Sequence, residues 1–229
     1  MRLKLYTESR SNSGDLLTCV LKRQTIAIGM EKLPEPTMTT NRQKQILRGR
    51  FLQQRQAMRV ELWRSQSQQI CHHLANSPQF MAARTILGYQ NCRQEPNLDE
   101  LFTDRTKQWG LARCVGKELL WHDWHPSEPL AIGRYGILEP HPKSPLLLPD
   151  RVDLILVPAI AIDRRGYRLG YGGGYYDRLF ADPLWRKIPT IGIVFDFAHM
   201  EDLDWSIDPW DIPLDAVCTE SGLTRFCAG

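Results

Sequence analysis

The chain has 229 residues, of which 42% are hydrophobic, and a formal net charge of +3 at neutral pH. Such a chain can bury one sizeable core, so we expect a single domain over residues 39–229, preceded by a weakly structured extension over residues 1–38. The charge is too mild for a nucleic-acid-binding protein, and no apolar run approaches the ~20 residues needed to cross a membrane.

The six cysteines are scattered along the chain and include no Cys-x-x-Cys pair. Neither a zinc site nor a disulfide framework is indicated, and we expect reduced thiols in a cytoplasmic protein. The N-terminal region lacks the apolar core of a secretory signal. Acidic residues at Glu8, Asp15 and Glu31 also interrupt the positive charge that an organellar presequence keeps.

The first predicted element is a helix over residues 40–58, which a capping-box pattern opens at Thr40. Lys44, Arg48 and Arg55 follow one another at helical spacing and project from one face of this helix. Spacing alone leaves open whether that face is a solvated basic surface or a ligand site.

A second helix is predicted over residues 60–75, and a short buried strand follows over residues 85–89. Glu95 and Asn97 come just beyond that strand. Ligands collect at the carboxyl ends of strands in open α/β sheets, which makes this segment a candidate binding region. A single glutamate in such a place is nevertheless more often a surface carboxylate.

The middle of the chain predicts a helix over residues 98–109, then two paired strands over residues 111–115 and 118–122. His122 and His125 lie close together in sequence. No third ligand accompanies them, so we do not expect a metal site there.

The apolar run over residues 154–157 is too short for a typical helix and has no polar face, which predicts a central parallel strand. Residues 175–186 are predicted to be helical with a break at Pro183, and residues 188–195 supply the next strand. Alternating strands and helices predict a layered, open α/β sheet, mainly parallel and flanked by helices.

The most informative stretch is a glycine-rich loop, with four glycines in the five residues from Gly170 to Gly174. Without Cβ atoms the backbone N–H groups can approach a phosphate, and the following helix directs its positive end to the same place. Arg168 and Asp177 flank the loop. Together they suggest that the loop binds the negative charge of a phosphate and a magnesium ion. The pattern is neither of the two common phosphate loops, and glycines alone fit a ligand-free turn equally well.

The segment from Arg168 to Arg178 resembles, almost residue for residue, the signature of the 5-formyltetrahydrofolate cyclo-ligases, also called 5,10-methenyltetrahydrofolate synthetases. Further matches to that family occur in order along the chain, and together they cover residues 41–219. They are Lys44 with Arg48, Gln94-Glu95, the segment 135–140 and the segment 210–215.

This resemblance implies a cyclo-ligase fold similar to that of the NagB/RpiA/CoA-transferase-like enzymes. It implies ATP-dependent conversion of 5-formyltetrahydrofolate to 5,10-methenyltetrahydrofolate, with release of ADP and phosphate. The implied ligands are ATP as co-substrate, Mg²⁺ as cofactor, and a folate with or without a polyglutamate tail. We expect no nucleic-acid partner and a monomeric enzyme.

The resemblance also implies a role for each matching residue. The expected ATP contacts are Lys44, Arg48, Arg168, Leu169, Gly170, Tyr171, Gly172, Gly173, Gly174, Tyr175 and Tyr176. Folate is expected to contact Glu95 and Tyr135, and Mg²⁺ to bind Asp177 and Asp211. The expected catalytic residues are Arg168, Tyr176 and Asp177. The residues alone leave an alternative to metal binding open, in which Asp177 caps a helix and Asp211 forms a turn.

Two positions depart from the family pattern, since Trp210 replaces a common histidine and Asn97 a common acidic residue. Asn97 keeps hydrogen-bonding groups but loses the charge. Two alternatives also remain open: an ATP-dependent enzyme of the same fold that acts on another formyl or amide compound, and a non-catalytic folate- or nucleotide-binding protein.

Overall fold

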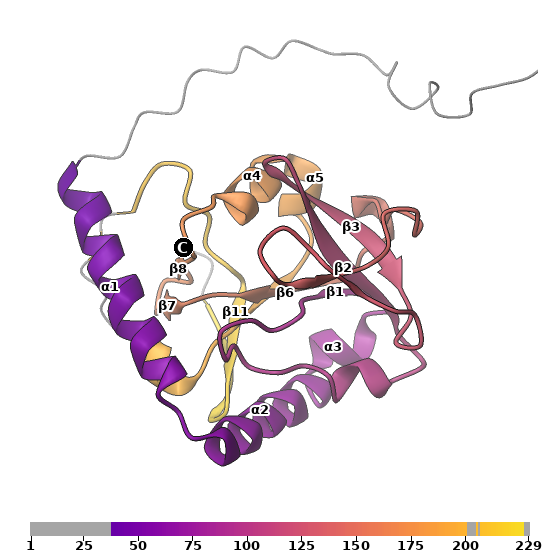
Figure 1. The fold of residues 1–229 in the computed structure, drawn as a ribbon, viewed down its shortest axis with the longest axis horizontal. Coiled ribbons are helices and arrows are strands. Elements are labelled where there is room, and N and C mark those ends of the chain that lie inside the picture. Colours follow the sequence, from indigo (N-terminus) through magenta and orange to yellow (C-terminus); the bar gives the residue numbers. More distant parts are fainter. Residues whose placement is uncertain (1–37, 201–204, 206, 227–229) are drawn as a thin grey trace, which may run out of the picture. The chain divides into compact units, whose positions relative to one another are not determined.

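The computed structural model describes residues 38–200, 205 and 207–226 (Figure 1). The predicted extension over residues 1–38 lies outside the described residues, apart from Met38, with which the first helix begins.

The described residues form a central sheet of seven strands in the order β12-β11-β9-β6-β1-β2-β3. Strands β11, β9, β6, β1 and β2 run parallel, and an antiparallel strand closes each edge. The predicted, mainly parallel open sheet is therefore confirmed. The strands are β1 (Thr85–Gly88), β2 (Gln108–Val115), β3 (Glu118–Trp124), β6 (Leu154–Pro158), β9 (Thr190–Ile193), β11 (Ala216–Thr219) and β12 (Gly222–Arg225).

Two small sheets accompany the central one. Strand β7 (Ala161–Asp163) pairs with β8 (Arg168–Leu169) and β10 (His199–Met200), while β4 (Ala131–Ile132) and β5 (Leu138–Glu139) form a separate hairpin. The short β8 leads directly into the glycine loop, so the small sheet fixes where that loop begins.

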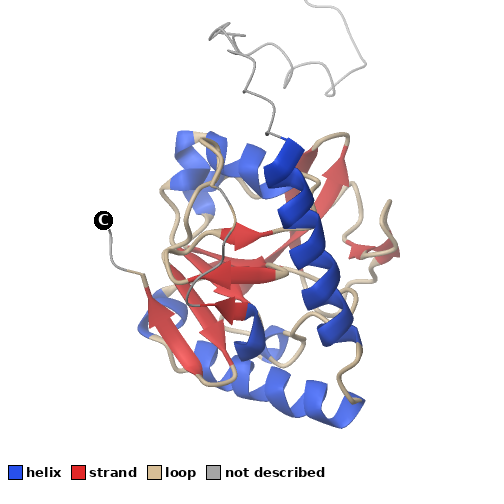
Figure 2. Ribbon diagram, turned by 90° about the vertical axis from the view of Figure 1, so that its left-hand side faces the viewer, coloured by secondary structure: helices blue, strands red, loops and turns tan. Residues whose placement is uncertain are grey.

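Helices cover the sheet on two sides (Figures 1 and 2). In the view of Figure 1, α2 and α3 lie below the sheet, α4 and α5 lie above it, and α1 runs along one side. The helices are α1 (Met38–Gln56), α2 (Val60–Ala75), α3 (Pro78–Ala82), α4 (Tyr175–Ala181) and α5 (Pro183–Arg186), with short 3₁₀ turns at Leu101–Thr103, Pro149–Arg151 and Asp196–Ala198.

Strand β6 separates the hydrophobic core into two layers. Its residues alternate: Ile155 and Val157 pack in the layer that contains Phe51 of α1 and Phe180 of α4, whereas Leu154 and Leu156 pack in the layer of α2. All four strand side chains are fully buried. This explains why the run is apolar at every position, and each such side chain contributes about 1.5–3 kcal/mol to folding.

Most predicted elements are present, with α2 spanning the predicted residues 60–75. Helix α1 begins at Met38, two residues before the predicted cap at Thr40. Pro183 ends one helix and begins another, as the sequence indicated, because α4 stops at Ala181 and α5 has Pro183 in its first turn.

The prediction of a helix over residues 98–109 is wrong. Side-chain turns replace it: Asn97 accepts the N–H of Asp99 at 2.7 Å, and Asp104 accepts the N–H of Thr106 at 2.9 Å. Such local bonds compete with helical hydrogen bonding. The end of the segment instead joins the sheet, where Trp109 pairs with Ile86 of β1.

Within the described ranges, no helix is both long enough and apolar enough to cross a membrane.

Candidate active site

The glycine loop lies at the carboxyl end of the parallel strands. Helix α4, which follows the loop directly, contacts the turn after β2: the Tyr175 hydroxyl donates to the carbonyl of Gly116 at 3.2 Å, and Arg178 Nε donates to the carbonyl of Lys117 at 2.6 Å. Gly174, with φ of +65°, is the residue before the first turn of α4. Glycine has no side chain that could accept hydrogen bonds from the N–H groups of that turn, which leaves them available to a ligand.

Arg168 and Asp177 pair across the two ends of the loop. One guanidinium nitrogen of Arg168 donates to the Asp177 carboxylate, and the other donates to the carbonyl of Ile212 at 3.0 Å. The guanidinium also lies over the rings of Tyr176 and Phe180. These contacts hold the loop closed at its base and fix Arg168 rigidly beside it.

Lys44 joins α1 to the C-terminal segment. Its Nζ lies 2.7 Å from the carboxylate of Asp208 and 3.0 Å from that of Asp211, residues that are 164 and 167 positions away in sequence. Asp211 also accepts the backbone N–H of Asp208 at 2.9 Å. The side chains of all three are at most 17% exposed, so this is a partly desolvated ion cluster rather than a surface pair.

Arg48 connects these groups, because its Nε donates to the carbonyl of Gly170 at 2.7 Å and its guanidinium lies against Gly172. Burial lowers the pKa of Arg48 and of Arg168, while the charges of Asp177 and Asp211 oppose that shift in both. Both carboxylates therefore interact electrostatically with both arginines. We call Lys44, Arg48, Arg168, Asp177, Asp208 and Asp211 the charged cluster.

The carboxylates of the charged cluster provide a hard-oxygen donor set. No group of three or more His, Cys, Asp or Glu side chains within the described residues is arranged as a metal site. Mg²⁺ needs only one or two protein carboxylates when phosphate and water complete its shell. Asp177 and Asp211 are carboxylates of this kind, and each is paired with a cation in the structure, Asp177 with Arg168 and Asp211 with Lys44.

Glu95 lies in a second group of hydrogen-bonded side chains beside the loop. One carboxylate oxygen accepts the hydroxyl of Tyr171 at 2.7 Å, the other accepts the backbone N–H of Cys92 at 3.0 Å, and Arg55 lies 3.9 Å away. Glu95 is 2% exposed and Arg55 3%. The alternatives of a surface carboxylate at Glu95 and a solvated face at Arg55 are therefore wrong.

Tyr135 lies at the rim and remains 55% exposed. Its hydroxyl lies 2.7 Å from that of Tyr175, and this bond raises the pKa of Tyr175 to about 12. The hairpin that carries Tyr135 is anchored to β2, since the carboxylate of the buried Glu139 accepts the N–H of Cys114 at 3.1 Å. An exposed aromatic ring on an anchored hairpin can pack against a flat ligand.

The structure thus brings the predicted residues into three adjoining groups that share the glycine loop. Leu169 differs from the rest, because its side chain is 1% exposed and packs in the core. Asn97, one of the two departures from the family pattern, uses its side chain in the local turn with Asp99.

Two members of these groups were not predicted as site residues. Arg55 lies on the same helix face as Lys44 and Arg48, and this helical spacing could have predicted it as a site residue. Asp208 lies three residues before Asp211 in a segment without regular structure, where the sequence offers no periodicity to place it.

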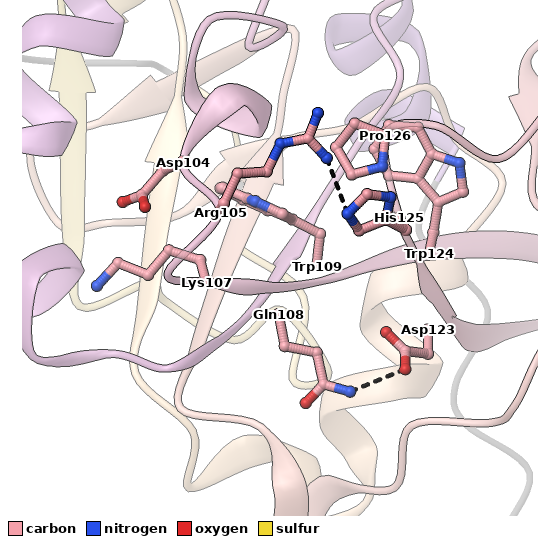
Figure 3. Close-up of a pocket in the computed structure, with 9 residues that line it drawn as sticks. All are labelled: Asp104, Arg105, Lys107, Gln108, Trp109, Asp123, Trp124, His125 and Pro126. Atoms are coloured by element: carbon pink, nitrogen blue, oxygen red, sulfur yellow. Dashed lines mark hydrogen bonds between the residues drawn. The ribbon is translucent and has the colours of Figure 1, made fainter.

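A pocket of about 250 Å³ lies at the opposite end of the β2–β3 pair (Figure 3). Its lining includes Gln108, the first residue of β2, and Trp124, the last residue of β3. Within this lining, Arg105 donates to Nε2 of His125 at 2.8 Å. The pocket therefore lies away from the carboxyl ends of the parallel strands and from the glycine loop.

Comparisons with known proteins identify the family of the chain. The model of the 5-formyltetrahydrofolate cyclo-ligase family matches residues 40–220. The 5-formyltetrahydrofolate cyclo-ligase of Escherichia coli K12 is 30% identical over 176 residues, which cover 74% of this chain and 96% of that protein.

Two solved structures are similar in fold. The 5,10-methenyltetrahydrofolate synthetase of Aquifex aeolicus is 33% identical with a TM-score of 0.71, over 81% of this chain and 94% of that one. The synthetase of Mycoplasma pneumoniae, at 24% identity and a TM-score of 0.62 over 77% and 98% of the two chains, supports the fold alone. From the match to the family model over most of its length, the chain belongs to the 5-formyltetrahydrofolate cyclo-ligase family.

Proposed function

We propose that the protein catalyses the ATP-dependent conversion of 5-formyltetrahydrofolate to 5,10-methenyltetrahydrofolate, with release of ADP and phosphate. The observation that carries this proposal is the charged cluster. Its cations and carboxylates come from α1, β8, α4 and the C-terminal segment, and they surround a glycine loop whose sequence resembles the family signature.

The chemical difficulty is that the N5-formyl oxygen is a poor leaving group. Transfer of the γ-phosphoryl group of ATP to that oxygen forms an iminium phosphate and releases ADP. N10 then attacks the formyl carbon, the C–O bond breaks, and the oxygen leaves as part of inorganic phosphate while N10 loses its proton. Enzymatic phosphoryl transfer of this kind depends mainly on positioning and charge stabilisation, and it needs no protein nucleophile.

The nucleotide side of the site consists of the loop and the cations around it. Lys44, Arg48 and Arg168 supply positive charge for the triphosphate, and the backbone N–H groups from Gly170 to Tyr176 supply donors. Arg168 is held by Asp177 and by the carbonyl of Ile212, so its charge is oriented before ATP arrives. Such preorganised donors stabilise the charge that develops on the transferred group.

Mg²⁺ would be held by Asp177 and Asp211, and when bound it would neutralise phosphate charge. In the structure, Lys44 bonds to Asp211 and Arg168 pairs with Asp177. These cations keep the two carboxylates compensated, so neither is a buried unpaired charge.

The folate side of the site consists of Glu95 and Tyr135. Glu95 is fixed by two hydrogen bonds and is nearly buried, so it offers a contact of defined direction to a pterin or formyl group. Tyr135 offers an exposed aromatic face. Ordering both substrates against one loop offsets the entropy of bringing the formyl oxygen to the γ-phosphate.

The direct test is to mix the purified protein with 5-formyltetrahydrofolate, ATP and Mg²⁺ and to follow the near-ultraviolet absorbance of the methenyl product and the release of ADP. The expected result is product and ADP in equal amounts, with no product when ATP is omitted. Asp177→Asn should lower kcat by about 100-fold or more, since it removes a carboxylate from the phosphate site.

The matched control is Asp182→Asn, which changes a carboxylate just after α4. Asp182 lies at the start of α5, where its side chain accepts the N–H of Leu184 at 2.8 Å, and asparagine can accept the same bond. This variant should retain wild-type activity. Release of ADP without methenyl product would contradict the proposed substrate and favour another formyl or amide compound.

A further inference from the structure

The hydroxyl of Tyr171 links the two halves of the proposed site. Tyr171 belongs to the glycine loop, and its hydroxyl donates to the Glu95 carboxylate at 2.7 Å while it accepts a hydrogen bond from Arg55. The guanidinium of Arg55 also lies over the Tyr171 ring, 5.8 Å from its centroid. One side chain of the nucleotide loop is therefore bonded directly to the carboxylate proposed to bind folate.

Arg55 holds three segments of the chain together at this point. Besides Tyr171, it donates to the carbonyl of Arg93 at 3.0 Å and to the carbonyl of Ala159 at 3.2 Å. It is 3% exposed, and Glu95 supplies a partly compensating charge 3.9 Å away. A buried arginine with partners on separate segments is a rigid joint, because moving any partner leaves a desolvated donor unsatisfied.

The backbone that carries Glu95 is held under strain. Arg93 and Gln94, immediately before it, have positive φ values of 47° and 56°, which cost about 1 kcal/mol or more for residues with a Cβ. The bond from Arg55 to the Arg93 carbonyl contributes to stabilising this turn. The orientation of Glu95 thus depends on Arg55 through the backbone and on Tyr171 through the side chain.

We propose that Tyr171, backed by Arg55, couples the two substrate subsites. Occupation of the glycine loop by nucleotide fixes Tyr171, which in turn fixes the Glu95 carboxylate for the folate. Because such coupling is reciprocal, folate binding strengthens nucleotide binding by the same factor. This inference rests on the proposed function for the identity of the two ligands.

The phenol remains a donor over the working range of pH. Burial and the neighbouring Glu95 charge raise the pKa of Tyr171 well above its ordinary value, so it stays protonated at and above neutral pH. Replacing it by phenylalanine removes the O–H and leaves the ring. Tyr171 is 40% exposed, so this substitution does not empty a core position.

The test is an equilibrium measurement of coupling with no chemistry. The dissociation constant of 5-formyltetrahydrofolate is measured by calorimetry with and without a saturating, non-hydrolysable ATP analogue and Mg²⁺. In the wild-type protein the analogue should tighten folate binding about fivefold or more, which is the usual lower range of allosteric coupling. In Tyr171→Phe this ratio should fall close to one, because nothing then transmits loop occupancy to Glu95.

The matched control is Tyr167→Phe, which removes a hydroxyl from a tyrosine that packs beside Arg165 before the loop. It should keep the wild-type ratio. Arg55→Lys, which retains the charge but loses the planar fork, should lower the ratio as Tyr171→Phe does. If Arg55→Lys does not fold, the Tyr171→Phe ratio alone decides the question.

A wild-type ratio near one, or an unchanged ratio in Tyr171→Phe, would overturn the coupling. Turnover of the wild-type protein is measured in parallel. If the wild-type protein forms product but the ratio of folate dissociation constants is unchanged in Tyr171→Phe, the coupling is overturned and the proposed function stands. If no product forms, the proposed function is contradicted, and the ratio still decides whether the two ligands are coupled.

Discussion

The Nζ of Lys44 lies within 3.0 Å of two carboxylates, Asp208 and Asp211. In the proposed mechanism the same amine also binds the triphosphate of ATP. We expect Lys44→Met to raise KM for ATP about tenfold or more, since a charge-assisted hydrogen bond contributes about 1.5–3 kcal/mol. KM for the folate should change less than twofold, because Glu95 and Tyr135 are untouched. Steady-state kinetics with each substrate varied in turn measures both values.

The control for Lys44 is Arg42→Gln on the same helix. Arg42 is exposed, so its removal tests whether any loss of positive charge from α1 weakens ATP use. Equal defects in both Michaelis constants for Lys44→Met would contradict its assignment to the nucleotide side.

Cys92 gives a pH-dependent test of the Glu95 environment. Burial and the Glu95 charge raise the pKa of the Cys92 thiol from 9.0 to about 11. A raised thiol pKa means less thiolate below pH 9, by about a hundredfold for two units. Alkylation of Cys92 by iodoacetamide, followed by peptide mass spectrometry, should therefore accelerate steadily up to about pH 11 rather than level off near pH 9.

Glu95→Gln provides the comparison, because it removes the negative charge and keeps the volume. The midpoint of Cys92 alkylation should move to lower pH in that variant. An unshifted midpoint would mean that the Glu95 carboxylate does not act on this thiol.

Among the structural elements, the junction between the glycine loop and α4 depends most on backbone conformation. Gly174 has φ of +65°, and a Cβ there would lie 2.7 Å from a guanidinium nitrogen of Arg178. Arg178 bonds to the carbonyls of Gly173 and Lys117, so displacing it loosens the loop. Gly174→Ala should lower the free energy of unfolding by about 1–2 kcal/mol, measured by urea denaturation.

The contrasting variant is Gly49→Ala in the middle of α1. A Cβ at Gly49 would meet nothing within 4 Å, and alanine favours a helix by about 1 kcal/mol over glycine. This variant should raise stability. If Gly174→Ala leaves stability unchanged or raises it, the assigned strain at Gly174 is wrong.

The sequence predicted those elements whose pattern is local. Strand β6 has no polar residue to interrupt its buried run, and α2 has periodic apolar positions between clear boundaries. The failure over residues 98–109 also has a local cause, since Asn97 and Asp104 form turns that hydrophobic periodicity does not register.

The site was predictable only in part. Helical spacing placed Lys44 and Arg48 on one face, and the family signature pointed to the loop. The partners of Lys44 lie 164 and 167 residues away, and spacing within one helix carries no information about them. The burial of Arg55 likewise depends on the distant segments of Ala159 and Tyr171 that cover it.

At the scale of the whole molecule, one chain supplies every group assigned to the proposed site. The parallel strands bring the end of β1, the turn after β2 and the glycine loop together at the carboxyl ends of the strands. Helix α1 crosses beside them (Figure 2). We therefore expect an active monomer. Light scattering at assay concentrations should give the mass of one chain, and specific activity should not change on dilution; activity lost on dilution would contradict this.

The central claim is that the formyl oxygen is phosphorylated before the ring closes. The most direct measurement is to supply 5-formyltetrahydrofolate with ¹⁸O in the formyl group and to analyse the released phosphate by mass spectrometry. The expected result is one ¹⁸O atom in each inorganic phosphate, because the oxygen leaves bound to phosphorus. Phosphate without ¹⁸O, with the label recovered in water, would contradict phosphorylation of the formyl group as the step that this site performs.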